Sequence, residues 1–241
     1  ALLKEWLGTN LRGAGKRVWL DVCGFSTASF QLIADAIGVS LAELTNCSLF
    51  QEPNLVMLPK VEGIDAVCTV VETTFKDVLP IIESARGLQE IHSIARVPGV
   101  IRLAFGSVDL ALDLGIDCDP DGAEIELLAF RSQLVLGSRL AALAAPVDGV
   151  STAIHDVQRL QVDAERSSRL GFGAKLCIHP QQVATVQAVF APSPQRIAWA
   201  RRVCEAFAAT GGAAVAVDGQ MVDLPVVQRA RAVLRDAGLN A

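Results

Sequence analysis

Two acidic side chains occupy similar places in successive units of an apolar repeat, and acids so arranged can share a metal ion. Glu83 directly follows the apolar run Val78–Ile82, and Asp109 comes shortly after the run Val100–Phe105. If these runs are neighbouring parallel strands, their carboxyl ends meet at the edge of the sheet where functional groups gather. Adjacent carboxylates repel each other unless a cation or proton lies between them. Mg²⁺ suits such a pair, because it needs only one or two carboxylates and leaves positions open for water or substrate oxygen.

Each of these acids also has a purely structural explanation. Glu83 could be an acid at the start of a helix, where the helix dipole favours it, and Asp109 could be a loop or N-cap residue. Lys60 and Glu62 follow an earlier apolar run, Leu55–Leu58, so the same strand-end rule selects them. For Lys60 a solvated cation is favoured over a catalytic base, and Glu62 is equally open to both interpretations.

The elements that must position these residues alternate along the chain. Short, continuously apolar runs are typical of parallel strands covered on both faces, and they occur at residues 18–23, 55–58, 78–82, 100–105, 149–154 and 174–178. Helical periodicity fills the intervals, with Ser84 and Asp156 as N-caps and Pro180 at a helix start. Strict alternation predicts an α/β fold with a parallel sheet. The six visible strands are two fewer than a closed (β/α)8 TIM barrel contains.

The alternation stops after Phe190. A further helix leads to two short apolar runs separated by Asp218–Gly219, a pair that favours a hairpin turn. Pro225 then opens a last helix. We therefore predict a barrel domain over residues 1–190 and a helix–hairpin–helix extension over residues 191–241, which we expect to contact a neighbouring subunit.

Composition excludes several classes of protein. The 241 residues include 21 Lys and Arg against 26 Asp and Glu, and a formal net charge of −5 lacks the basic surface of a nucleic-acid binder. With 51% hydrophobic and 20% charged residues, the chain is globular rather than disordered. The uncharged stretch 176–195 holds three prolines and four glutamines, so it is not a membrane span. The six scattered cysteines lack C-x-x-C spacing, and we expect free thiols in a cytoplasmic protein.

Six short segments carry a family resemblance. In order they are residues 57–62 (MLPKVE), 82–87 (IESARG), 105–110 (FGSVDL), 147–150 (VDGV), 171–180 (GFGAKLCIHP) and 218–225 (DGQMVDLP). Together they resemble the citrate lyase beta-subunit branch of the HpcH/HpaI aldolase family, which includes malyl-CoA and citramalyl-CoA lyases. The similarity runs from about Pro53 to the end of the chain, and the set is far more specific than any one motif.

The resemblance implies a TIM barrel that binds Mg²⁺ through Glu83 and Asp109. It also implies cleavage or formation of a carbon–carbon bond in a 3-hydroxyacyl thioester such as citryl-, malyl- or citramalyl-CoA. Such cleavage releases a 2-oxo acid, whose oxygens can chelate the metal, and an acetyl-thioester enolate that must be protonated. The expected partners are therefore small molecules, an acyl-CoA or a 2-oxo acid.

The resemblance also assigns roles to residues around the substrate. The proton donor corresponds to Asp223 in the predicted hairpin, reaching in from a neighbouring subunit, and the same analogy suggests a homotrimer. Four residues fall at substrate-binding positions: Gly106, Ser107, Lys60 and Glu62. Asp21 stands where the family's third strand carries an arginine that holds the substrate carboxylate. An acid cannot make that fork-shaped contact and would repel the carboxylate.

Two alternatives to the thioester lyase stay open. One is an aldolase acting on free 2-oxo-3-hydroxy acids, although the Met221–Asp223 segment favours the thioester branch. The other is an inactive barrel with a structural or regulatory role, since Asp21 replaces the arginine and the first two strands of the family barrel are absent. Either the natural chain has a further N-terminal portion, or the barrel closes with another subunit.

Overall fold

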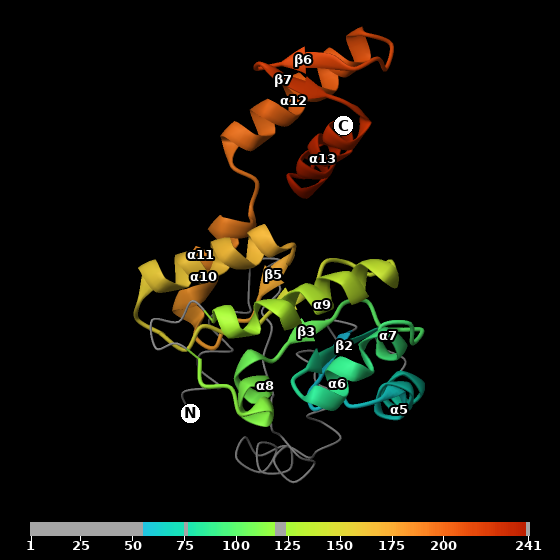
Figure 1. Ribbon diagram of the computed structural model, residues 1–241, viewed down its shortest axis with the longest axis vertical. Coiled ribbons are helices and arrows are strands. Elements are labelled where there is room, and N and C mark those ends of the chain that lie inside the picture. The colour runs from blue at the N-terminus through green and yellow to red at the C-terminus, as the bar shows by residue number, and fades with distance from the viewer. Residues whose placement is uncertain (1–54, 75–76, 119–123, 240–241) are drawn as a thin grey trace, which may run out of the picture. The chain divides into compact units, whose positions relative to one another are not determined.

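The computed structural model describes residues 55–74, 77–118 and 124–239 (Figure 1). The predicted strand over residues 18–23 and Asp21 lie outside the described residues. The rest divides into two compact units. The first holds the described residues up to Thr152 together with Arg166–Ile178, and the second holds Ala153–Glu165 together with the described residues from His179 onward.

The first unit contains a parallel sheet of five strands among the described residues. In sheet order they are β1 (Leu55–Leu58), β2 (Asp77–Ile82), β3 (Ala104–Phe105), β4 (Val147–Asp148) and β5 (Ala174–Lys175). Each strand pairs in parallel with the next along the chain. A sequential parallel order is that of a TIM-barrel wall, and it confirms the predicted α/β fold with a parallel sheet.

Helices fill the intervals between these strands. They are α5 (Ile64–Thr74), α6 (Ala85–Gln89), α7 (Ile91–Ile94), α8 (Ser107–Leu114), η1 (Ile125–Leu127), α9 (Leu128–Leu140) and α10 (Val157–Leu170). The predicted caps are confirmed. The Ser84 hydroxyl accepts the Gly87 N–H at 3.1 Å, and the Asp156 carboxylate accepts the Arg159 N–H at 2.9 Å.

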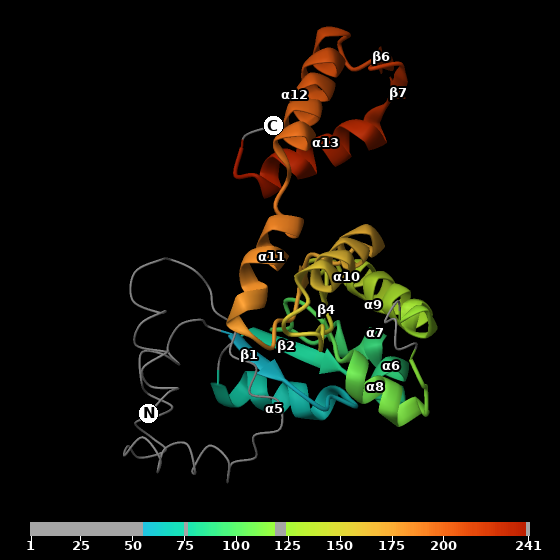
Figure 2. The same ribbon diagram turned by 90° about the vertical axis from the view of Figure 1, so that its left-hand side faces the viewer.

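Strand β2 shows why the apolar runs are continuous. Its five residues after Asp77 are all buried, and α5 packs against it (Figure 2). Its residues Val78 and Ile82 join Leu103 and Phe105 in the larger hydrophobic core of the unit, while Leu79 and Ile81 belong to a smaller cluster. Since successive side chains of a strand point to opposite faces, both faces of β2 are covered.

The strand predicted over residues 149–154 is placed wrongly. Strand β4 is Val147–Asp148, and residues 149–154 follow it without regular structure. The apolar pattern failed here because Asp148 interrupts it, although this carboxylate is fully buried. Two other runs are longer than their strands, since β3 covers only the end of 100–105 and β5 only the start of 174–178.

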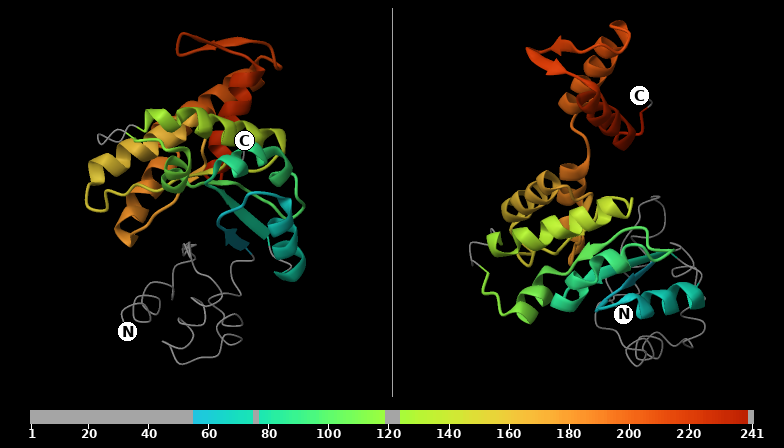
Figure 3. Two further views of the ribbon diagram at one scale, coloured as in Figure 1. Left: turned by 60° about the horizontal axis from the view of Figure 1, so that its bottom comes forward. Right: turned by 45° about the vertical axis from the view of Figure 1, so that its right-hand side comes forward.

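The second unit includes a hairpin between helices. Its elements from His179 onward are α11 (Pro180–Phe190), α12 (Pro194–Ala209), β6 (Val215–Val217), β7 (Gln220–Val222) and α13 (Leu224–Asp236), and Figure 3 shows β6 and β7 paired. The strands are antiparallel, and Asp218 and Gly219 both have positive φ (52° and 77°) in the turn between them. This confirms the predicted hairpin, whose residue Val222 packs with α12 and α13.

Two further sequence expectations can be compared with the described residues. The cysteines among them are free thiols, namely Cys68, Cys118, Cys177 and Cys204. None of the described helices is long and apolar enough to cross a membrane.

Candidate functional site

The predicted acid pair lies at the carboxyl ends of β2 and β3. Glu83 directly follows β2 and is only 5% exposed, whereas Asp109 lies in the first turn of α8 and its side chain is 48% exposed. Lys60, just beyond β1, contacts both. Its backbone N–H donates to Glu83 Oε1 at 2.7 Å, and its ammonium forms an ion pair with Asp109 and lies 3.8 Å from Glu83 Oε1. Residues from three consecutive strand ends are therefore gathered around one positive charge.

Gly106 leaves the room that Glu83 occupies. A Cβ atom added to Gly106 would lie 2.4 Å from Glu83 Cβ and 2.7 Å from Glu83 Oε2. Carbon atoms do not approach so closely, so the presence of glycine at the end of β3 allows the acid at the end of β2 to be placed there. Gly106 thus contributes by leaving room for Glu83, not by contacts of a side chain.

The Ser107 hydroxyl is buried at the start of α8. Ser107 is 2% exposed, and its oxygen has no hydrogen-bond partner among the described residues. A Cβ on Gly149 would come within 2.5 Å of this oxygen, so the hydroxyl lies against the end of β4. Buried polar atoms are nearly always paired, so this hydroxyl is a candidate to bind a water molecule or a ligand.

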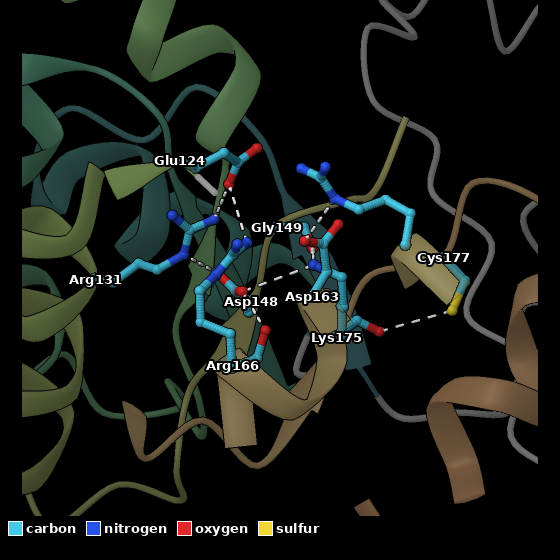
Figure 4. A network of polar contacts seen from close by, with 10 residues as sticks. Glu124, Arg131, Asp148, Gly149, Asp163, Arg166, Lys175 and Cys177 are labelled. Carbon is cyan, nitrogen blue, oxygen red and sulfur yellow. Dashed lines mark hydrogen bonds and ion pairs between the residues drawn. The ribbon is translucent and has the colours of Figure 1, made fainter. Parts of the chain in front are cut away.

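A buried charge network behind the strand ends was not predicted as part of the site (Figure 4). Asp148, at the end of β4, accepts hydrogen bonds from Arg131 Nε at 2.9 Å and from the Ser167 hydroxyl, and Lys175 Nζ lies 3.7 Å away. Lys175 Nζ also donates to the Gly149 carbonyl at 2.8 Å. The network therefore ties β4 to β5, to α9 and to α10.

Arg131 extends the network to the other side. Its side chain is fully buried, pairs with Glu124 as well as Asp148, and lies 5.0 Å from the centre of the Phe105 ring. The guanidinium thus reaches from α9 to strand β3, where a cation over an aromatic face is stabilised.

The network keeps its members charged. Burial alone would raise the pKa of Asp148, but the positive charges of Lys175 and Arg131 and the Ser167 hydrogen bond outweigh it, so this pKa lies below its usual value. Burial alone would lower the pKa of Arg131, and the charges of Asp148 and Glu124 raise it instead. The sequence signal for this network is the presence of charged residues beside or within apolar segments. A charge buried there requires a partner of opposite charge.

The remaining predicted residues have other local surroundings. Glu62 is exposed and makes no hydrogen bond or ion pair with another described residue. Asp223 belongs to the second unit, where it is the N-cap of α13 and accepts the Val226 N–H at 3.3 Å. His179, in the motif over residues 171–180, caps α11 through Nδ1.

The donor set of Glu83 and Asp109 fits Mg²⁺. The described residues contain no group of three or more His, Cys, Asp and Glu side chains that could hold a metal. Two carboxylates nevertheless suffice for Mg²⁺, which keeps several water or substrate oxygens. The ammonium of Lys60 is a stand-in cation, because it lies close to oxygens of both acids at once.

The fold and site define a TIM-barrel-like α/β protein with an acidic pair at the carboxyl ends of neighbouring strands. Residues 41–180 match the family described as HpcH/HpaI aldolase/citrate lyase, and the chain belongs to this family. The family predicted from the sequence motifs is therefore confirmed.

Three similar proteins place the chain within this family. A citrate lyase subunit beta-like protein of Mycobacterium tuberculosis is 36% identical over 185 residues, covering 76% of this chain and 66% of that protein. A (3S)-malyl-CoA thioesterase of Cereibacter sphaeroides is 34% identical over 191 residues, covering 76% and 64%. The crystal structure of CitE from M. tuberculosis with magnesium, acetoacetate and coenzyme A has a TM-score of 0.69 and 32% identity, covering 89% of this chain and 75% of that chain. The chain spans just under two thirds of the length of the two curated relatives.

Proposed function

We propose that this protein is a Mg²⁺-dependent carbon–carbon lyase acting on a 3-hydroxyacyl thioester such as malyl-, citramalyl- or citryl-CoA. The observation that carries the proposal is the pair Glu83 and Asp109, two acids from neighbouring strand ends gathered around one cation. The CitE structure, which contains magnesium, acetoacetate and coenzyme A, supports the same metal and the same class of ligand. The products would be a 2-oxo acid and acetyl-CoA.

The chain offers distinct groups for each part of this reaction. Glu83 and Asp109 would hold the metal, which when bound polarises the oxygens of the 2-oxo acid portion. The buried Ser107 hydroxyl and the free N–H groups at the start of α8 can donate hydrogen bonds to a substrate carboxylate. Gly106 belongs to the same substrate-binding segment, and Lys60 and Glu62 would lie at the rim.

The cleavage itself needs one proton removed and one supplied. The 3-hydroxyl passes its proton to solvent, and its C–O bond becomes the carbonyl of the 2-oxo acid. The bond to the carbon beside the thioester breaks, and its electron pair passes to the thioester enolate. We propose that Asp223 of a neighbouring subunit, within a homotrimer, protonates this enolate to give acetyl-CoA. Light scattering should then give the mass of three chains, and a monomeric active enzyme would exclude this arrangement.

Asp223→Asn separates the proton donor from the helix cap. Asparagine caps a helix about as well as aspartate, so α13 should keep its stability while the acid is lost. Removing a general acid lowers the rate by about 100-fold or more. We expect that loss with an unchanged melting temperature, and wild-type turnover by this variant would remove Asp223 from the mechanism.

Product analysis tests the proposed reaction directly. The purified chain is incubated with Mg²⁺ and malyl-CoA or citramalyl-CoA, and acetyl-CoA and the 2-oxo acid are quantified. Glu83→Ala and Asp109→Ala should abolish both turnover and the calorimetric signal of Mg²⁺ with pyruvate, oxaloacetate or glyoxylate. If the wild type gives no such metal-dependent signal, the lyase proposal fails.

The relative named as a (3S)-malyl-CoA thioesterase supports a second candidate, thioester hydrolysis. Hydrolysis of malyl-CoA yields free CoA and malate without acetyl-CoA, so the same assay distinguishes the two. Cleavage of free 2-oxo-3-hydroxy acids would instead indicate the aldolase alternative. Metal binding without turnover of any of these substrates would indicate an inactive barrel.

A further inference from the structure

Lys60 has a backbone conformation that residues other than glycine rarely adopt. Its φ is +54°, in the left-handed region, where a side chain is strained. Such strain persists only where surrounding contacts enforce it, and it concentrates at functional sites. Here the enforcing contact is the 2.7 Å hydrogen bond from the Lys60 N–H to Glu83 Oε1.

The backbone next to Lys60 is fixed, while its side chain is not enclosed. Val61 is 1% exposed, and its carbonyl lies so close to Gly87 that a Cβ there would be 2.5 Å from the oxygen. The Lys60 side chain is 65% exposed. The ammonium can therefore move away from the acids without disturbing the N–H that holds Glu83.

We infer that Lys60 is an internal counter-cation of the acid pair, which a divalent cation displaces. Its ammonium contacts both Glu83 and Asp109 and offsets their mutual repulsion. A divalent ion brings twice that charge to the same oxygens and displaces the ammonium. The backbone N–H keeps Glu83 in place in both states, so the site is assembled before metal arrives.

This inference rests on the proposed function only in that Glu83 and Asp109 must bind the metal. The Lys60 ammonium competes with the metal ion, because a cation already at the carboxylates weakens the binding of another. Removing the Lys60 charge should therefore tighten metal binding, whereas removing a residue that helps to bind the metal would weaken it. The two possibilities predict changes of opposite sign.

Lys60→Met tests this, since methionine removes the charge and keeps the backbone N–H. By isothermal calorimetry we expect Mg²⁺ to bind the variant roughly 2- to 5-fold more tightly than the wild type, because the Lys60 ion pair is largely exposed and therefore weak. In EDTA the variant should melt at a lower temperature than the wild type, and saturating Mg²⁺ should reduce that difference. Lys60→Gly, which accepts a positive φ without strain, should tighten Mg²⁺ binding in the same direction.

Arg86→Met is the matched control. Arg86 is exposed on α6 and makes no side-chain ion pair with another described residue, so this variant changes the net charge equally without touching the acids. Its Mg²⁺ affinity and its melting temperature in EDTA should match the wild type.

The outcomes separate this inference from the proposed function. Suppose that the wild type binds Mg²⁺ and that Glu83→Ala abolishes this binding. If both Lys60 variants then bind Mg²⁺ no more tightly than the wild type, the role of Lys60 is overturned while the proposed function stands. If the wild type binds no Mg²⁺, both this inference and the metal-dependent function are overturned. Equal tightening by Arg86→Met would reduce the effect to net charge and would also overturn the inference.

Discussion

Replacing Gly106 by alanine should disable the acid pair while leaving the chain folded. The added Cβ would lie 2.4 Å from Glu83 Cβ, and ordinary contacts begin at 3.4 Å, so the atoms must separate by 3.4 − 2.4 = 1.0 Å. Glu83 cannot easily yield, because it follows five buried residues of β2 and accepts the Lys60 N–H. Overpacking of this kind costs about 1–3 kcal/mol.

A shift of this size should affect metal binding and turnover more than it affects folding. Displacing a reacting group by 1 Å can cost about 100-fold in rate. Loss of a group that orients a metal ligand typically costs about 10- to 100-fold in metal affinity. For Gly106→Ala we therefore expect Mg²⁺ binding to weaken at least about 10-fold by calorimetry, turnover to fall about 100-fold, and the urea unfolding free energy to drop by about 1–3 kcal/mol.

Gly63→Ala is the matched control for this substitution. Gly63 lies in the loop after β1, its backbone is not in the left-handed region, and a Cβ there would meet no atom within 4 Å. Metal affinity, turnover and stability should all stay at wild-type levels, with stability within about 0.5 kcal/mol.

A double-variant cycle links the Gly106→Ala effect to Glu83. In a Glu83→Gly background the clashing Cβ and carboxylate are both gone, so the stability cost of Gly106→Ala should largely disappear. If Gly106→Ala binds Mg²⁺ and turns over like the wild type, Glu83 does not act from the position described. If its stability cost persists in the Glu83→Gly background, the clash is not the cause.

Other predictions concern the buried network around Asp148. Asp148→Asn removes the buried carboxylate that pairs with both Arg131 and Lys175 and should lower the urea unfolding free energy by about 3–5 kcal/mol. The same change at Asp218, which pairs with Arg202 on the surface, should cost at most about 1 kcal/mol. Because the pKa of Asp148 is lowered on folding, its stabilisation is complete above about pH 4 and is lost as the pH falls through the folded value. The free energy of unfolding of Asp148→Asn should therefore change less with pH in the acid range than that of the wild type. An equal pH dependence would place the titrating group elsewhere.

Much of the fold could be predicted because parallel strands leave a strong local signature. The run Val78–Ile82 is apolar throughout since β2 is covered on both faces. Ser84 was recognised as an N-cap because its hydroxyl bonds to the backbone of the helix that directly follows it, which is a local contact. The strand-end rule then identified Glu83 and Asp109, because chain direction alone puts the carboxyl ends of parallel strands at one edge.

The contacts within the site could not be predicted in the same way. Lys60 was expected to be a solvated cation, and its side chain is largely exposed, yet its ammonium bridges acids 23 and 49 residues away in sequence. Gly106 entered only through a family motif, and its physical reason lies in a side chain from another strand. Neither residue type nor local spacing reports a neighbour brought close by tertiary structure.

Asp148 shows how a misplaced strand and a missed network have one cause. A charged residue was treated as a break in an apolar run, on the assumption that charge belongs at the surface. The strand was therefore predicted at residues 149–154 instead of at β4. Asp148 is buried at the end of β4 because Arg131 and Lys175 are buried with it, from α9 and β5. Buried charges of this kind come in sets, since an unpaired one costs several kcal/mol. An acid beside a strand-like run, with a Lys on the next strand, therefore predicts a buried pair. Here Lys175 also donates to the Gly149 carbonyl, and the α-carbon of Gly149 lies against the Ser107 hydroxyl.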